Sequence, residues 1–216
     1  MNEYLKAHRL LPAAGLATLV TLVGWWLAGT AVPLPQLVSG LASPVELQLF
    51  ATVVMAPLTV WTFDEEVLRL EASSRRRLWV LDLAVLAALV GPSCLLAAAA
   101  TAAGEGAHTV ELARNTVLFV GLAFLCHAAA GQTAALVIPV AYFLAMGTAG
   151  SRRDGTHQPW AFPADGADPR TVGLSLTLFA LGFLAFAVRR RRGAGSGPSS
   201  GRRAPAAPSR GSRQPA

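Results

Sequence analysis

Long apolar runs alternate with short polar connections along the chain up to about residue 190. The longer runs reach the roughly 18–20 residues that an α-helix needs to cross a bilayer core of about 30 Å. They are continuous and rich in Leu, Ala and Val, whereas the strands of a membrane barrel would be short and alternating. The pattern therefore predicts an all-α, polytopic membrane protein with six transmembrane helices. The predicted spans are 10–32, 45–63, 78–103, 112–129, 132–149 and 171–188.

Three features inside the runs affect the boundaries of the spans. The apolar sequence 116–147 is too long for one ordinary helix, and "HAAAGQT" at 127–133 is the natural place for a break between two short spans. A single long tilted helix is the alternative. Pro57 and "GPSC" at 91–94 predict bends in the second and third spans. The first run exceeds the length of a signal-peptide core, which favours an uncleaved span.

Charge is scarce and unevenly placed, which predicts an orientation. Only 14% of the residues are charged, and they gather between the runs. With the N-terminus inside, fourteen basic residues lie in inner segments and four, Arg114, Arg152, Arg153 and Arg170, lie in outer ones. The positive-inside rule then predicts an N-in, C-in protein. The Ala-, Gly- and Arg-rich composition suggests a bacterial inner (plasma) membrane.

The chain divides into a six-helix domain, 1–190, and a Gly-, Pro-, Ser- and Arg-rich tail, 191–216, which is expected to be disordered. Much of the excess positive charge lies in this tail. No basic face is interleaved with aromatic residues, so attraction to anionic lipid explains the charge better than nucleic-acid binding does. Cys94 and Cys126 lie inside apolar runs without metal-ligand spacing. We expect no cofactor and no metal site from the sequence.

The segment 64–77, "DEEVLRLEASSRRR", is a charged interruption between the second and third runs. As a helix it would pair Glu65 with Arg69 and Glu71 with Arg75 at i,i+4, and it would carry acids at its start and arginines at its end. One interpretation is a loop that orients the protein and binds lipid headgroups. The other is a short amphipathic helix that docks a partner.

The layout of residues 1–190 resembles the permease subunit of type-two ABC transporters, a family of exporters with six spans per permease chain. In that family a cytoplasmic coupling helix between spans two and three fits into a separate ATPase subunit, and "DEEVLRLE" followed by "SSRRR" lies at this position. The family also has an outer re-entrant or interfacial element between spans five and six. "THQPWAFPADGADP", in the predicted outer loop 150–170, lies there.

The resemblance implies a permease that works as a homodimer or heterodimer and performs no chemistry itself. The chain has no glycine-rich phosphate loop, so a partner would hold the nucleotide. The implied coupling residues are Glu65, Glu66, Leu70 and Glu71. The residues expected to anchor the protein at the membrane are Arg75, Arg76, Arg77, Arg189, Arg190, Arg191 and Arg192. The alternative is a non-enzymatic membrane scaffold or accessory protein.

Catalytic groups are sparse, which makes a membrane-embedded enzyme the least favoured class. "EEVLR" at 65–69 resembles the EExxxR motif of intramembrane prenyl-proteases, but its arginine is one residue early. His127 is expected to cap a helix end or meet water, and Asp82 to pair near the interface. The polar residues within runs are expected to form hydrogen bonds between helices. These residues are Gln48, Thr52, Gln132 and Tyr142.

Overall fold

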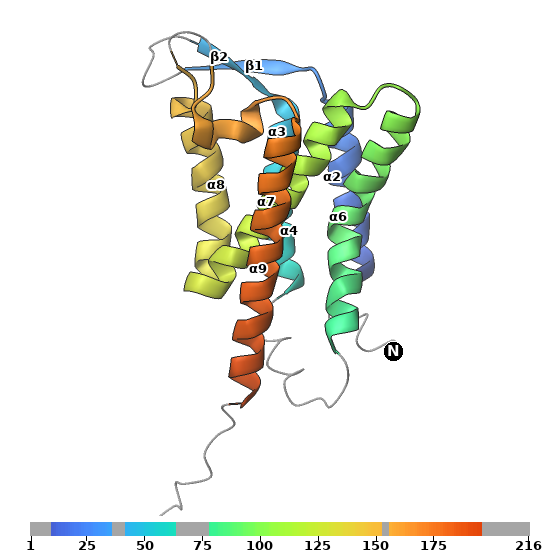
Figure 1. The fold of residues 1–216 in the computed structure, drawn as a ribbon, viewed down its shortest axis with the longest axis vertical. Helices are drawn as coiled ribbons and strands as arrows, with labels where there is room; N and C mark the ends of the chain where they lie inside the picture. Colours follow the sequence, from blue (N-terminus) through green and yellow to red (C-terminus); the bar gives the residue numbers. More distant parts are fainter. Residues whose placement is uncertain (1–9, 36–41, 64–77, 153–155, 196–216) are drawn as a thin grey trace, which may run out of the picture.

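The computed structural model describes residues 10–35, 42–63, 78–152 and 156–195 (Figure 1). These residues are mostly helical. In chain order the elements are α2 (Leu10–Trp26), β1 (Ala31–Pro35), β2 (Ala42–Glu46), α3 (Leu47–Val53), α4 (Met55–Thr62), α6 (Leu78–Ala102), α7 (Ala107–Ala130), α8 (Gln132–Ala149), the 3₁₀ helix η1 (Pro159–Ala164) and α9 (Pro169–Gly195).

The long helices run in alternate directions along one axis (Figure 1). As a result β1, β2 and η1 lie together at one end of the molecule, which we call the hairpin end. The other end holds the start of α2, the end of α4, the α7–α8 turn and the end of α9. We call it the arginine end, because α9 finishes there in the run Arg189–Arg192.

The described helices have the character of a membrane-embedded protein. Four of them contain segments long and apolar enough to cross a membrane: Leu83–Ala102, Ala107–Ala130, Gln132–Ala149 and Pro169–Arg190. The remaining two apolar segments, Leu11–Trp26 and Leu47–Thr62, are shorter. The sequence prediction of a multi-pass helical protein is confirmed at this level, while the number of spans and their orientation stay predictions.

Glycine and proline set two breaks near their predicted places. α7 ends at Gly131, whose φ of 90° lies in the left-handed region that favours glycine, and α8 begins at the next residue. Pro57 has no N–H to donate to the carbonyl of residue 53, and the second run breaks at Val54, between α3 and α4. Pro92 lies within α6, which stays continuous.

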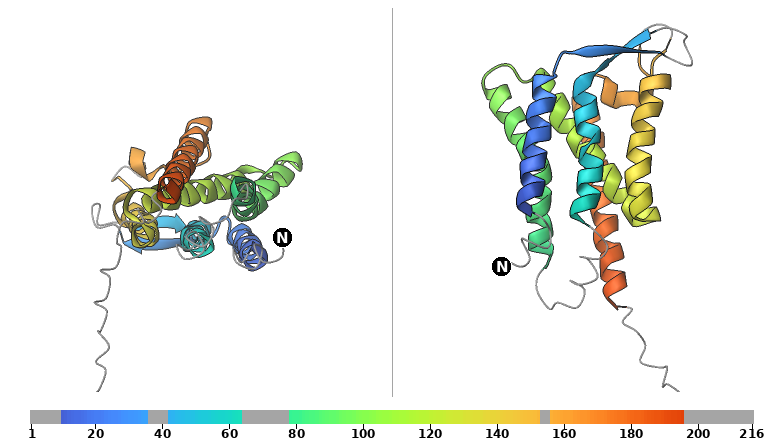
Figure 2. Two further views of the ribbon diagram at one scale, coloured as in Figure 1. Left: turned by 90° about the horizontal axis from the view of Figure 1, so that it is seen from below. Right: turned by 180° about the vertical axis from the view of Figure 1, so that it is seen from behind.

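Helix α7 occupies the centre of the bundle. It contacts α2, α3, α4, α6, α8 and α9. Viewed along the axis, α2, α4 and α8 form a row on one side of α7, while α9 lies on the other (Figure 2). The apolar stretch of α7 is 78% buried, whereas the apolar stretches of α6, α8 and α9 are only 22–28% buried. The central helix is therefore covered by protein, and its neighbours expose apolar faces.

Two large apolar clusters and a smaller third one, formed by Val60, Cys126 and Ala135, fill the described bundle. Towards the arginine end, Phe63, Phe124 and Phe186 meet with ring centroids 5.1–5.5 Å apart, a spacing typical of favourable aromatic pairs. They join α4, α7 and α9 around Leu89 of α6. Towards the hairpin end a second cluster joins α3, α7, α8 and η1, and its largest members are Leu49, Phe119, Phe143 and Met146.

The all-α prediction omitted a two-stranded antiparallel sheet. β1 and β2 pair with Ala31 opposite Glu46 and with Pro33 opposite Pro44. Proline cannot donate to a ladder, but in a two-stranded sheet every strand is an edge, so its missing N–H can face away from the partner. The hairpin joins α2 to α3 and extends across the end of the bundle (Figures 1 and 2).

Candidate functional site

The predicted coupling segment falls outside the described residues. Glu65, Glu66, Leu70, Glu71 and Arg75–Arg77 all belong to 64–77. The described elements on either side of it in the sequence, the end of α4 and the start of α6, lie at the arginine end of the bundle (Figure 1). Both neighbouring elements thus lie at the end of the bundle at which α9 finishes.

Arg189, one of the predicted anchoring residues, caps a neighbouring helix. Its Nη1 donates to the carbonyls of His127 and Ala128 at 2.7 and 2.8 Å, in the last turn of α7. These carbonyls belong to the last turn, where helix carbonyls lack complete intrahelical pairing, and a cation there also suits the helix dipole. Arg190 and Arg192 lie beyond it on α9, with Arg192 exposed, while the Arg191 side chain is outside the described set.

His127 lies where the sequence placed it, in the last turn of α7, but it is not solvated. It is 7% exposed, and its ring lies 5.3 Å from the ring of Phe186 on α9. The helix-end interactions of His127 are made by its backbone carbonyl, which accepts hydrogen bonds from Gly131 N and from Arg189. The Asp82 side chain lies outside the described set.

Arg114 corrects the sequence analysis most clearly. "GEGAHTVELARN" was expected to be a polar outer connection, with a span beginning at residue 112. Instead α7 begins at Ala107, and Arg114 lies two turns inside it with 3% of its surface exposed. Gly106 starts the helix by accepting from Val110 N. An arginine counted among the charges of the outer connections is therefore buried within the bundle.

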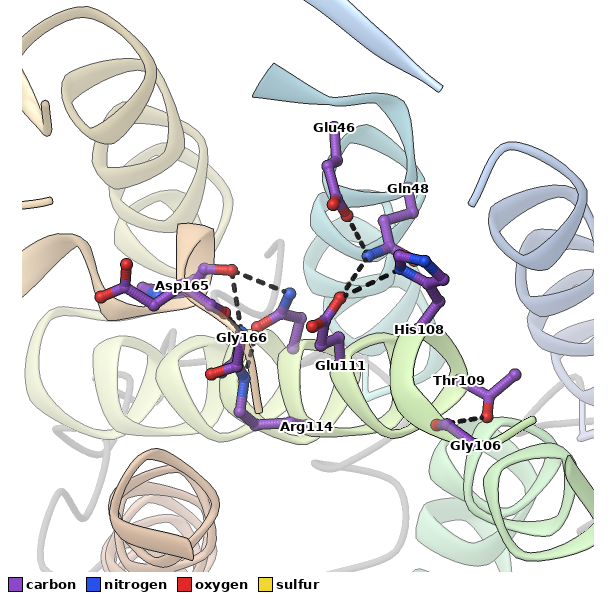
Figure 3. Close-up of polar contacts among 11 residues, drawn as sticks. Glu46, Gln48, Gly106, His108, Thr109, Glu111, Arg114, Asp165 and Gly166 are labelled. Carbon is purple, nitrogen blue, oxygen red and sulfur yellow. Dashed lines mark hydrogen bonds and ion pairs between the residues drawn. The ribbon is translucent and has the colours of Figure 1, made fainter. Parts of the chain in front are cut away.

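The buried guanidinium uses all five of its N–H donors, a fixed fork that no other side chain offers. Nη2 donates to the carbonyls of Pro163 and Asp165, at 2.9 and 2.8 Å. Nη1 donates to the Gly166 carbonyl and the Thr171 hydroxyl, at 2.9 and 3.1 Å, and Nε donates to Asn115 Oδ1 at 3.1 Å. We call this group the Arg114 clamp (Figure 3).

The clamp holds the connection between α8 and α9 against α7. Asn115 Nδ2 adds a hydrogen bond of 3.2 Å to the Pro163 carbonyl. None of the five acceptors of Arg114 is a carboxylate, so backbone and side-chain dipoles solvate the buried charge. The element predicted between spans five and six, which contains η1, is thus held in place at the hairpin end by these hydrogen bonds.

Tyr142 and Trp160 fasten the same connection to α8. The Tyr142 hydroxyl donates to the Trp160 carbonyl at 2.6 Å, and the two rings lie 6.5 Å apart. Trp160 itself is 41% exposed, and an exposed tryptophan of this kind is typical of the membrane–water interface. Of the other polar residues predicted to join helices, Thr52 bonds within its own helix, to the Leu49 carbonyl.

A second polar group lies beside the clamp, and we call it the carboxylate–histidine cluster. It consists of Glu46, Gln48, His108 and Glu111, whose side chains point toward one another from the β2–α3 junction and from α7 (Figure 3). Gln48 Nε2 donates to both Glu46 and Glu111, at 3.2 Å in the latter case. His108 Nδ1 lies 3.5 Å from the Glu111 carboxylate. Gln48 therefore does link two helices, as predicted.

Sequence reasoning missed both groups because their members are separated along the chain. Glu46 and Glu111 are brought together by the packing of α3 on α7, and Arg114 meets carbonyls some fifty residues away. One signal was available: "ARN" begins an otherwise apolar stretch, and a charged residue at such a place needs a buried partner.

Comparison with models of known protein families, with characterised proteins and with solved structures returned no match for this chain.

Proposed function

We propose that this protein is the permease subunit of an ATP-driven ABC-type exporter, with six spans and both termini in the cytoplasm. The observation that carries the proposal is that α4 ends and α6 begins at the arginine end, on either side of the 64–77 segment in the sequence (Figure 1). The arginine-rich end of α9 lies at the same end of the molecule (Figure 1). Positive charge favours the cytoplasmic side, so this end would face a soluble ATPase.

The two shorter apolar segments complete a six-span arrangement. Because α2 and α3–α4 alternate in direction with the four longer helices, each returns the chain to the opposite end (Figures 1 and 2). With this alternation each apolar segment would cross the membrane once, and successive connections would lie on opposite sides of it. The Arg114 clamp would then fix the outer element between the last two spans.

Motion transmitted through 64–77 would reach α4 and α6, which flank the segment. Both helices contact α7, the buried centre of the bundle. The exposed apolar faces of α2, α6, α8 and α9 would face lipid or a second permease chain. The proposed partners are thus membrane lipid, another permease chain and a separate ATP-binding subunit.

The experiment is affinity purification of the tagged protein from its native membranes in mild detergent, followed by mass spectrometry. We expect an ATPase subunit in stoichiometric amount. Reversing Glu65 and Glu66 to Lys together, or Glu71 alone, should remove it. The matched controls reverse Glu105 and Asp165 together, or Glu105 alone; both acids are exposed at the hairpin end, and the ATPase should remain.

Two results would contradict the proposal. Purification with membrane proteins alone would favour the accessory-protein alternative. Equal loss of the ATPase in the control variants would show that binding depends on the overall negative charge of the protein and not on the acids of the 64–77 segment.

A further inference from the structure

The carboxylate–histidine cluster has the donor atoms of a metal site. Glu46, His108 and Glu111 each offer one ligand atom, and these atoms lie within 4.8 Å of one another. Glu46 is the last residue of β2, while His108 and Glu111 lie in the first two turns of α7. The fold therefore brings two carboxylates and an imidazole from two elements to a single point (Figure 3).

The described side chains that contact these carboxylates are the Gln48 amide and the His108 imidazole, while Arg114 attracts both carboxylates electrostatically without forming an ion pair with either. Both carboxylates converge on the neutral amide of Gln48, and like charges at such distances repel each other. Arg114 is the nearest buried cation on α7, but all five of its N–H groups are used in the clamp. A divalent cation between the carboxylates would remove the repulsion.

Gln48 gives a second, independent indication. It is 1% exposed, and its Oε1 has no hydrogen-bond partner while Nε2 faces the two carboxylates. A buried acceptor without a partner costs about 1–3 kcal/mol. Rotating the amide by half a turn would direct Oε1 into the cluster. Two carboxylates would repel that oxygen, but a cation would bind it.

The donor set selects the class of ion. Mg²⁺ and Ca²⁺ prefer oxygen ligands alone, whereas Zn²⁺ and its first-row neighbours bind imidazole nitrogen together with carboxylate oxygen. His108 is exposed, so an ion could enter from the solvent at the hairpin end. A bound ion would join the β1–β2 hairpin and the start of α3 to the start of α7.

We infer that Glu46, His108 and Glu111, with the amide oxygen of Gln48, bind a divalent first-row transition metal ion for which Zn²⁺ is the appropriate probe. This inference does not depend on the proposed transport function. It assigns a role to a group of residues from which the sequence predicted no metal site.

The test is isothermal titration of the purified full-length protein with Zn²⁺ after removal of the affinity tag. We expect a single saturable site whose affinity falls at least tenfold in His108→Ala and in Glu111→Gln, because loss of even supporting residues weakens metal binding by about 10–100-fold. Matched controls are His157→Ala and Glu105→Gln, a histidine and an acid at the same end outside the cluster. Mg²⁺ and Ca²⁺ should not compete.

A spectroscopic measurement on the unaltered protein covers the case in which a variant fails to fold. X-ray absorption at the zinc edge should show imidazole scattering with nitrogen and oxygen ligands at about 2.0–2.2 Å. Absence of saturable binding, wild-type affinity in both cluster variants, or a ligand shell without imidazole would each overturn the inference.

Discussion

At the scale of single residues, Arg114 determines how the hairpin end is built. Its guanidinium organises three backbone carbonyls, a hydroxyl and an amide oxygen, and it does so while 3% exposed. Lysine has three donors on a single nitrogen and cannot reproduce a planar five-donor fork. The residue is thus specified by geometry as well as by charge.

We expect Arg114→Ala to lower the free energy of unfolding by more than about 2 kcal/mol, because several buried acceptors lose their donor. Arg114→Lys should restore only part of this loss. Thermal unfolding in detergent, followed by near-ultraviolet circular dichroism, measures both variants. The control is Arg170→Ala, an exposed arginine close to the same connection. Full rescue by lysine would contradict the five-donor account.

Asp168 caps α9 and should make its stability depend on pH. Its Oδ1 accepts from Thr171 N at 2.7 Å, and this backbone hydrogen bond is the main reason why the pKa of the Asp168 carboxyl lies below its ordinary value. Further contributions come from the Thr171 hydroxyl and from Arg170. A lowered pKa means that the stabilisation is complete above the ordinary pKa and is lost as pH falls through the folded-state value.

The matched variant is Asp168→Asn, which keeps the acceptor and removes the charge. We expect the wild type to melt at a higher temperature than the variant at neutral pH, and the difference to disappear well below pH 4, the approximate ordinary pKa of aspartate. A difference that stays constant across this range would show that the charge of Asp168 does not stabilise the helix.

Residue by residue, the sequence was least informative about buried polar groups. Hydropathy placed Gln48 in an apolar run and Arg114 in a connection, and neither assignment reveals a partner more than forty residues away. The helix-end position of His127 could be predicted because it depends on local chain breaks. The partners of Arg114 depend on how α7 packs against the α8–α9 connection, which only the three-dimensional structure supplies.

At the scale of elements, α7 and α9 pack closely because two glycines face each other. A Cβ atom added at Gly121 would lie 2.5 Å from Phe179 Cα, and one added at Gly182 would overlap the Gly121 carbonyl. Helices in membranes associate largely through such close packing, since lipid provides no hydrophobic drive between them. The glycines therefore hold α9 against the central helix.

Gly121→Ala or Gly182→Ala should destabilise the protein by about 1–3 kcal/mol, because the two backbones must separate. Gly173→Ala is the control on the same helix: nothing lies within 4 Å of the added methyl, and alanine is the better helix former. Melting temperatures of the three variants in detergent provide the test. Equal effects at positions 173 and 182 would contradict close packing.

The elements themselves were largely predictable. Apolar runs gave the helices, and the breaks at Gly131 and near Pro57 follow from backbone chemistry that the sequence displays. The hairpin was not predicted, because Pro33 and Pro44 ordinarily argue against strands. The start of α7 was placed too late, since its first two turns are polar and pack on neighbouring elements instead of following an apolar pattern.

At the scale of the whole molecule, a covered central helix is surrounded by helices with exposed apolar faces. Leu11, Trp26, Leu95 and Leu184 are each more than 60% exposed. In water such surfaces would drive association, whereas lipid or a second chain covers them without cost. The same arrangement separates two chemically different ends: the arginine-rich end of α9 at one, the Arg114 clamp and the carboxylate–histidine cluster at the other.

The account depends most on these two ends facing opposite sides of the membrane. Labelling of single cysteines with a membrane-impermeant maleimide tests this directly, in a background with Cys94 and Cys126 replaced by alanine. Suitable exposed positions are Glu105 and Asp165 at the hairpin end, and Ala130 and Arg192 at the arginine end.

We expect cysteines at 105 and 165 to react in intact cells, and cysteines at 130 and 192 to react only after the cells are permeabilised. That result would place the 64–77 segment in the cytoplasm, where an ATPase could dock. An inverted pattern, or reaction of both ends from the same side, would contradict the six-span topology and the exporter function built on it.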